Sequence, residues 1–285
     1  MRRIILSVFM LLVFNGVEAQ NVLRETRNTF ANYGAKITKV VIPSTSLADL
    51  MLRDAVNKGW RISPFEFCSM DEYNKIKEDT SYFFLLRVDG RFRNELEPKI
   101  EYLTLIKGGA EVKRGLYSSR DILTLPLQEI EESSGTNLYL IPMYIDLIQN
   151  HIYRVQKDLS LAFKGNAIYS NKVAGIKEKN FLFSIDLLNY KTAEEDFSEL
   201  FNGEVKLVTD TEIEDAIIEN RTNTVVPIII KPKGGSRGSY CYKLLVGTDS
   251  HELFFFRRHK ISRRVPLGFT KEDIRKISVP FQFNY

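Results

Sequence analysis

Three residues of this chain form a motif that could carry a nucleophile. Gly234, Ser236 and Gly238 match the Gly-x-Ser-x-Gly pattern, in which the serine of acyl-transfer enzymes attacks the substrate. That serine is exposed because a strand turns sharply into a helix. Here residues 239–246 continue with the pattern of another strand, so we interpret the motif as a hairpin loop. The same loop lacks the Gly-Lys-Ser/Thr ending of a phosphate-binding loop.

The three histidines are too scattered in the sequence to suggest a shared metal ion. His151, His251 and His259 form neither a His-x-x-x-His nor a His-Glu-x-x-His pair. In an extended strand, residues eight positions apart, such as His251 and His259, are separated by about 26 Å. We therefore expect structural or surface histidines, with no metal and no cofactor.

Carboxylates gather in the first turns of three predicted helices. They are Asp71 and Glu72, then Glu194, Glu195 and Asp196, then Asp210, Glu212, Glu214 and Asp215. Negative charge complements the positive end of the helix dipole, which is a sufficient structural reason for this placement. A catalytic pair would need carboxylates from different elements to converge in one cleft. We assign no catalytic residue.

The strongest run of positive charge follows the aromatic stretch at residues 254–256. Its members are Arg257, Arg258, Lys260, Arg263 and Arg264. Such a run could bind an anionic surface, for example lipid head groups or an acidic polysaccharide. The alternative is an ordinary solvated loop that keeps the end of a strand soluble.

The two cysteines, Cys68 and Cys241, each lie in an apolar, strand-like run. Buried free thiols are one interpretation of this setting. A disulfide between the two halves of the chain is the other, and an oxidising compartment would permit it. Two cysteines are too few for a disulfide scaffold or a cysteine-based zinc site.

Residues 1–19 have the layout of a cleavable export signal. Arg2 and Arg3 precede an apolar run over residues 4–14, and Ala19 precedes the expected cleavage before Gln20. A membrane span needs about 20 apolar residues, so this run is too short to be one. We expect an exported, soluble protein, in the periplasm or alternatively outside the cell, without a nucleic-acid partner.

The composition is that of a folded globular protein. Hydrophobic residues make up 44% of the chain and charged residues 27%, which excludes the disordered class. The net charge of +4 is mild and requires no polyanionic partner.

Hydrophobic periodicity predicts the same order of elements in both halves of the chain. In the first half we expect strands at residues 37–42, 61–68, 80–88, 99–106 and 121–127, and helices at 44–58, 69–77 and 142–161. In the second half we expect strands at residues 180–185, 204–208, 224–230, 239–246 and 252–258, and helices at 192–201, 209–219 and 270–277.

Two capping boxes fall at the same place in this order, at residues 69–72 and 209–212. We infer an internal duplication, with a first unit at residues 20–165 and a second at 166–285. Each unit reads β-α-β-α-β-β-β-α. Right-handed crossovers make its first three strands parallel, and short loops make its last strands antiparallel. The expected fold class is α/β (α+β), with two mixed five-stranded sheets covered by helices.

Each unit resembles the small periplasmic domains found in the amino-terminal part of TolB and in the curli-secretion channel protein. The residues that carry this resemblance are Leu47–Trp60, Ile62–Ile76, Tyr82–Val88 and Ile100–Ile106, with their counterparts in the second half. Gly59–Cys68 and Gly238–Lys243 also resemble an uncharacterised group of exported Bacteroidota proteins. These resemblances imply the fold and an envelope location, and no chemistry.

The function that these patterns favour is that of a non-enzymatic binding or assembly component of the periplasm or cell envelope. Its partner would be a protein or another envelope component, and edge strands could pair with partner segments. The alternative is a hydrolase with a site in the cleft between the units, using carboxylates or Ser236.

Overall fold

The structure is a computed structural model, which describes most of the chain that follows the predicted export signal. The described residues are 24–90, 100–114, 121–130, 137–170, 176, 178–201, 204–232 and 238–278. The predicted export signal, Gly234 and Ser236 lie outside them. Within the described residues, no helix is both long and apolar enough to cross a membrane.

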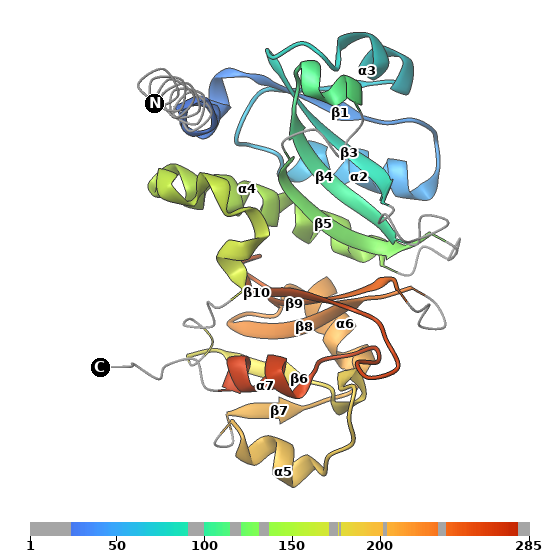
Figure 1. Cartoon of the computed structure of the whole chain (residues 1–285), viewed down its shortest axis with the longest axis vertical. Coiled ribbons are helices and arrows are strands. Elements are labelled where there is room, and N and C mark those ends of the chain that lie inside the picture. The colour runs from blue at the N-terminus through green and yellow to red at the C-terminus, as the bar shows by residue number, and fades with distance from the viewer. Residues whose placement is uncertain are drawn as a thin grey trace, which may run out of the picture.

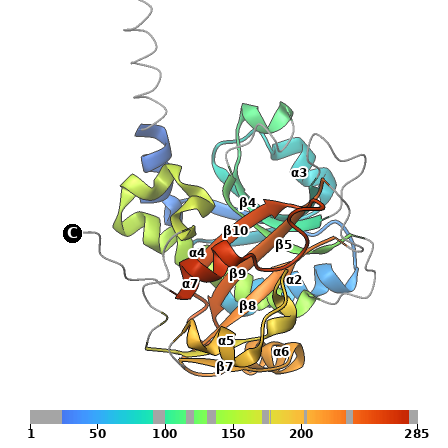
Figure 2. The same ribbon diagram turned by 60° about the horizontal axis from the view of Figure 1, so that its bottom comes forward.

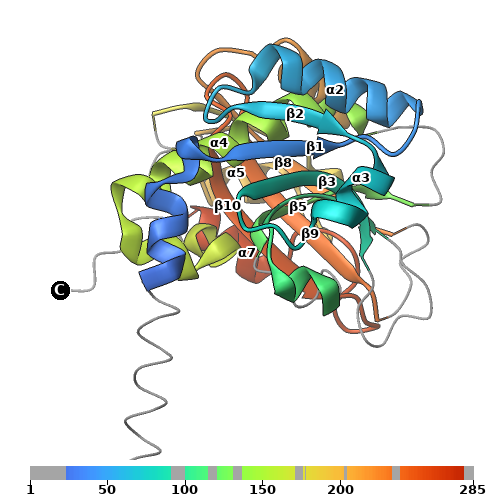
Figure 3. The same cartoon turned by 90° about the horizontal axis from the view of Figure 1, so that it is seen from above.

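The first unit contains a five-stranded sheet with the order β2-β1-β3-β4-β5 (Figure 1). Its strands are β1 Ile37–Val41, β2 Phe65–Cys68, β3 Tyr82–Gly90, β4 Ile100–Lys107 and β5 Asp121–Glu129. Strand β1 pairs in parallel with β2 and β3, whereas β4 runs antiparallel to both β3 and β5. Figure 3 shows β2, β1 and β3 side by side in this order.

The second unit repeats this topology, with the order β7-β6-β8-β9-β10. Its strands are β6 Asn180–Phe183, β7 Val205–Leu207, β8 Thr224–Ile230, β9 Tyr240–Gly247 and β10 Leu253–Lys260. Strand β6 pairs in parallel with β7 and β8, and the remaining pairs are antiparallel. The predicted pair of mixed sheets, with the strand directions expected, is therefore confirmed.

Helices cover both faces of each sheet. They are α2 Leu47–Gly59, α3 Met70–Ile76 and α4 Ile141–Lys157 in the first unit, and α5 Glu194–Glu199, α6 Asp210–Ile218 and α7 Lys271–Ser278 in the second. Helices α2 and α4 pack on one face of the first sheet, and α3 packs on the other with the 3-10 helix η2 (Ala110–Arg114). In the second unit, α5 and α7 share one face and α6 covers the other (Figure 2).

Side-chain caps begin several of these helices where the sequence predicts them. The Ser69 hydroxyl accepts a hydrogen bond from the backbone N–H of Glu72 at 3.1 Å, and the Thr209 hydroxyl accepts one from Glu212 at 3.2 Å. These caps satisfy N–H groups that the helix itself leaves without a partner.

Several predicted boundaries are wrong by a few residues, and local features account for some of the differences. Strand β2 begins only at Phe65, because Pro64 just before it has no N–H to donate. Helix α4 ends at Lys157, since the next residue, Asp158, accepts from Ser160 at 3.0 Å and starts a 3-10 helix. Helix α5 begins at Glu194, after Ala193, which supplies no side-chain cap.

The two units share one hydrophobic core. Side chains of α4 and β5 lie in the same buried cluster as side chains of β8, β9, β10 and α6. At its centre the hydroxyl groups of Tyr102 and Tyr242 are hydrogen-bonded at 2.8 Å. The predicted boundary after residue 165 falls at the 3-10 helix η5 (Gly165–Tyr169), which contacts both β5 and β10.

Candidate functional site

Two neighbouring strands of the second unit carry charges where the first unit carries leucines. Lys243 pairs with Arg257 across β9 and β10, and Leu103 pairs with Leu125 across β4 and β5. These pairs occupy equivalent positions, because Lys243 lies opposite the sixth residue of β8 and Leu103 lies opposite the sixth residue of β3. The first residues of β8 and β3 in turn pair with the first residues of β6 and β1. The fold itself therefore does not require charged residues here.

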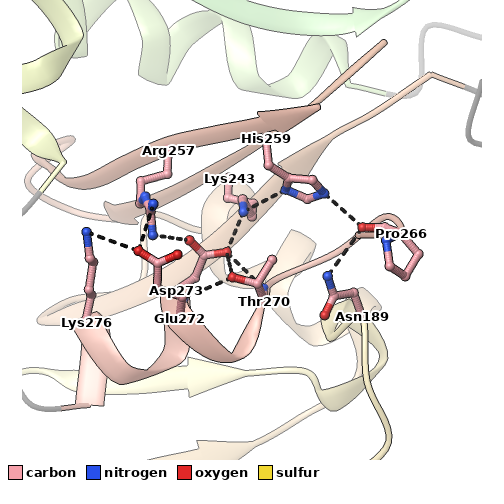
Figure 4. Close-up of polar contacts among 9 residues, drawn as sticks. All are labelled: Asn189, Lys243, Arg257, His259, Pro266, Thr270, Glu272, Asp273 and Lys276. Carbon is pink, nitrogen blue, oxygen red and sulfur yellow. Dashed lines mark hydrogen bonds and ion pairs between the residues drawn. The ribbon is translucent and has the colours of Figure 1, made fainter. Parts of the chain in front are cut away.

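Lys243 and Asp273 form a buried ion pair between β9 and α7 (Figure 4). Their side chains are 2% and 1% exposed. The backbone N–H and the hydroxyl of Thr270 each donate to the same Asp273 oxygen at 2.8 Å. Arg257 donates to the other carboxylate oxygen at 3.0 Å. Burial alone would raise the pKa of Asp273, but Lys243 and the Thr270 donors outweigh it and lower that pKa.

His259 connects this ion pair to the surface loop that follows β10. Its Nε2 lies 2.8 Å from the carbonyl oxygen of Pro266, so Nε2 carries a proton and donates. Its Nδ1 lies 2.9 Å from the Lys243 Nζ and accepts from that ammonium. Burial and the charge of Lys243 lower the pKa of His259. The imidazole is therefore held neutral in one tautomer.

A cavity of about 740 Å³ lies beside Pro266. It is lined by Ile185, Asp186, Leu188, Asn189, Tyr190, Lys191, Thr192, Ile261, Ser262, Pro266 and Leu267. These residues belong to the loops that follow β6 and β10. The volume is within the range of small-molecule sites, and the lining mixes apolar side chains with a few polar groups, as in such sites.

The two loops that line the cavity are tied together by backbone contacts. The N–H of Phe269 donates to the Leu187 carbonyl at 2.8 Å, and the N–H of Asn189 donates to the Phe269 carbonyl at 3.0 Å. Gly268 allows this approach, because a Cβ there would lie 2.7 Å from the Leu187 carbonyl oxygen. The His259–Pro266 hydrogen bond adds a further attachment, so the buried ion pair fixes one wall of the cavity.

The cavity lies at the edge of the sheet where β6, β8 and β10 end. These strands run in the same direction, since β6 is parallel to β8 and β9 is antiparallel to both β8 and β10. The helices that follow β6 and β7, namely α5 and α6, cover opposite faces of the sheet. Ligands of open α/β sheets bind at such points, beyond the carboxyl ends of the strands.

The five cations that the sequence suggests as a binding surface do not form one patch. Arg257 is ion-paired with Asp273, whereas Arg258 on the other face of β10 lies over the Tyr240 ring at 5.0 Å. Lys260, Arg263 and Arg264 are exposed. The alternation of side chains along β10 separates the first of these charges from the second. Of the run, Arg263 and Arg264 lie in the loop that lines the cavity.

The two cysteines do not form the disulfide that the sequence permits. Cys68 and Cys241 are both free and buried. Burial raises the pKa of each thiol, to about 11 for Cys68. The interpretation as buried free thiols agrees with the structure.

The other two histidines have structural partners. His151 is buried and its Nδ1 lies 2.9 Å from the Tyr169 hydroxyl. His251 Nδ1 lies 2.8 Å from an Asp146 carboxylate oxygen. Among the described residues, no group of three or more His, Cys, Asp or Glu side chains is placed to hold a metal ion.

The predicted acidic clusters do not converge. Glu72 pairs with Lys39 at 3.0 Å, and Glu212 pairs with Lys206 at 3.3 Å on the other unit. The carboxylates of these clusters stay on their own helices, and Glu214 and Asp215 lie beyond the first turn of α6. Ser236 lies outside the described residues.

Sequence reasoning missed Lys243 and Asp273. Lys243 interrupts the otherwise apolar strand β9, and a charge in a buried strand is the signal that could have found it. Asp273 is hidden as an ordinary acidic residue in the first turn of α7. No family model, curated protein or solved structure matches the chain. The site is therefore interpreted from its own geometry.

Proposed function

We propose that this protein is an exported, non-enzymatic binding component of the cell envelope, with its ligand site in the cavity beyond β6 and β10. The export signal at residues 1–19 and the resemblance to periplasmic domains favour the location. A protein or another envelope component would supply the bound group. The cavity volume of about 740 Å³ is sufficient for a small molecule or a side chain of a partner.

The observation that carries this proposal is the charged cluster behind the cavity wall. A buried ion pair is weak evidence for stability, and replacing it with apolar residues is often neutral or stabilising. The first unit folds with Leu103 and Leu125 at the same positions. The sheet can therefore form without charges at these positions. The charges of the second unit are better explained by a second role, which is to hold the cavity loop through His259 and Pro266.

The same geometry favours binding over catalysis. The Asp273 carboxylate accepts from Lys243, Thr270 and Arg257, and His259 uses both ring nitrogens for hydrogen bonds. Neither Lys243 nor Asp273 lines the cavity. These groups support the cavity wall. A general base would instead need an unoccupied hydrogen-bonding position that faces the substrate.

Affinity capture from native envelope, followed by mass spectrometry, tests the proposal. Thr192 lines the cavity, so Thr192→Trp fills it, and Lys75→Trp adds the same side chain on the exposed side of α3 as a matched control. We expect the wild type and Lys75→Trp to capture the same component and Thr192→Trp to lose it. Equal capture by all three proteins, or no captured component, would contradict the proposal.

A further inference from the structure

The turn between β9 and β10 is docked on helix α4 of the first unit. Asn150 Nδ2 donates to the carbonyl oxygens of Ser250 at 3.1 Å and His251 at 3.0 Å. His251 bridges the units, with Nδ1 2.8 Å from Asp146 and Nε2 3.0 Å from the side-chain oxygen of Asn220. The backbone of His251 has a φ of 48°, in the left-handed region that few residues other than glycine adopt and in which histidine is enriched.

A second cavity, of about 480 Å³, lies beside this contact. It is lined by Leu147, Asn150, Tyr153, Arg154, Lys157, Tyr169, Ser250, Glu252 and Leu253. The first five of these residues belong to α4 and the last three to the β9–β10 turn and β10, so both units are needed to form the cavity.

The charged groups of this cavity are not paired with each other. Within the described part of the chain, Arg154, Lys157 and Glu252 take part in no ion pair. Lys157 and Glu252 are exposed, and the half-buried Arg154 lies over the Tyr169 ring, with no carboxylate as its partner in the described part of the chain. The junction cavity therefore holds charges of both signs that remain available to a ligand.

The positive and negative charges of this cavity come from different elements, and both act on Tyr169. Arg154, on α4, is 5.3 Å from the centre of the Tyr169 ring, while Glu252 belongs to the β9–β10 turn. Burial raises the pKa of Tyr169 to about 12, Arg154 acts to lower it, and Glu252 acts to raise it further. Both charges are thus close enough to act on one hydroxyl, which His151 fixes at 2.9 Å.

We propose that this junction cavity binds a small zwitterion, namely an α-amino acid or a short peptide with an apolar side chain. Its carboxylate would contact Arg154 and Lys157, and its ammonium group would contact Glu252. Tyr153, which is 41% exposed, supplies an aromatic surface for the side chain, and the nearly buried Leu147 and Leu253 lie behind it in the lining. This site is separate from the cavity beyond β6 and β10, so the proposal stands or fails independently of the function proposed above.

Isothermal titration of the purified protein tests the charge requirement. The probes are L-phenylalanine and the dipeptide L-phenylalanyl-L-phenylalanine, and each has two controls that lack one charge, the N-acetylated form and the C-terminal amide. We expect saturable binding of at least one zwitterion, weakened about two- to fivefold in both single-charge forms. A single-charge form that binds as tightly as its zwitterion would overturn the proposal, as would no binding by either zwitterion.

Matched variants locate the bound molecule. Glu252→Gln should bind the zwitterion no more tightly than the N-acetylated form. Arg154→Gln should bind the zwitterion no more tightly than the C-terminal amide. Lys75→Gln changes an exposed lysine of α3 outside the cavity and should leave binding unchanged. Zwitterion binding that is the same in all three variants would place the ligand elsewhere and overturn the proposal. Thermal unfolding of each variant confirms that it remains folded.

Discussion

Lys243 in the second unit occupies the position that Leu103 occupies in the first. Both residues are buried, and both lie in the fourth strand of their unit. The repeated topology thus provides an internal comparison, in which one fold tolerates either an apolar side chain or a buried ion pair at the same place.

Replacing Lys243 with methionine should strongly destabilise the protein. The variant leaves Asp273 buried without its main partner, and breaking one side of a buried pair costs about 3–5 kcal/mol. The double variant Lys243→Met/Asp273→Asn removes that uncompensated charge and should recover most of the loss. Urea unfolding measures both. Leu103→Met, the matched change in the first unit, should cost less than about 1.5 kcal/mol. If Lys243→Met lowers the free energy of unfolding no more than Leu103→Met does, Asp273 does not depend on Lys243 as its main partner.

Replacing His259 with phenylalanine should loosen the loop that lines the larger cavity. The variant keeps an aromatic ring and removes the hydrogen bond to the Pro266 carbonyl. We expect faster hydrogen exchange over residues 261–267, measured by mass spectrometry, with a loss of stability of about 1 kcal/mol. His251→Phe alters the junction between the units and should leave exchange in this loop unchanged. Equal protection in wild type and His259→Phe would show that the loop is held by other contacts.

Acidification should destabilise the protein through its buried histidines. Burial, followed by the nearby Arg154, lowers the pKa of His151 from 6.5 to about 4, and the pKa of His259 is also lowered. A depressed folded-state pKa means that the unfolded chain binds the proton first. The stabilisation is therefore complete above pH 6.5 and is lost as the pH falls toward the folded pKa.

For His151, the free energy of unfolding that is lost between pH 6.5 and about 4 is about 3 kcal/mol. Urea unfolding at a series of pH values measures it, and His151→Phe should flatten the curve in this window. The lowered carboxyl pKa values, such as that of Asp273, act mainly below about pH 5, so the slope between pH 6.5 and 5 reports the histidines. An unchanged slope in His151→Phe would exclude His151 as its source.

Replacing Gly268 with alanine should destabilise the cavity loops more than the same change at Gly165. Gly268 has a φ of 110°, and its new Cβ would meet the Leu187 carbonyl oxygen at 2.7 Å. Gly165 has a φ of 44° and no atom within 4 Å of the new Cβ. We expect a cost of about 3 kcal/mol at Gly268 and about 1 kcal/mol at Gly165, measured by thermal unfolding.

The free thiols should be inert in the folded protein. Burial raises the pKa of both Cys68 and Cys241, which suppresses the reactive thiolate. A thiol reagent should label neither residue under native conditions and both in urea, and a reductant should leave the melting temperature unchanged. A melting temperature that falls on reduction would instead indicate a disulfide.

The order and direction of the elements could be predicted from the sequence alone. Hydrophobic periodicity and the caps at Ser69 and Thr209 depend on residues a few positions apart, so they can be recognised in a single chain. The predicted strand directions follow from the lengths of the connections, and they agree with both sheets.

Which of the charges lie together could not be predicted, because it depends on contacts between distant parts of the chain. Asp273 lies thirty residues beyond Lys243, and Tyr102 meets Tyr242 across 140 residues. No local pattern records such pairs, because they depend on how α7 packs on its sheet and how one unit packs on the other. The same packing left both cysteines free and placed the two cavities at a sheet edge and at the junction.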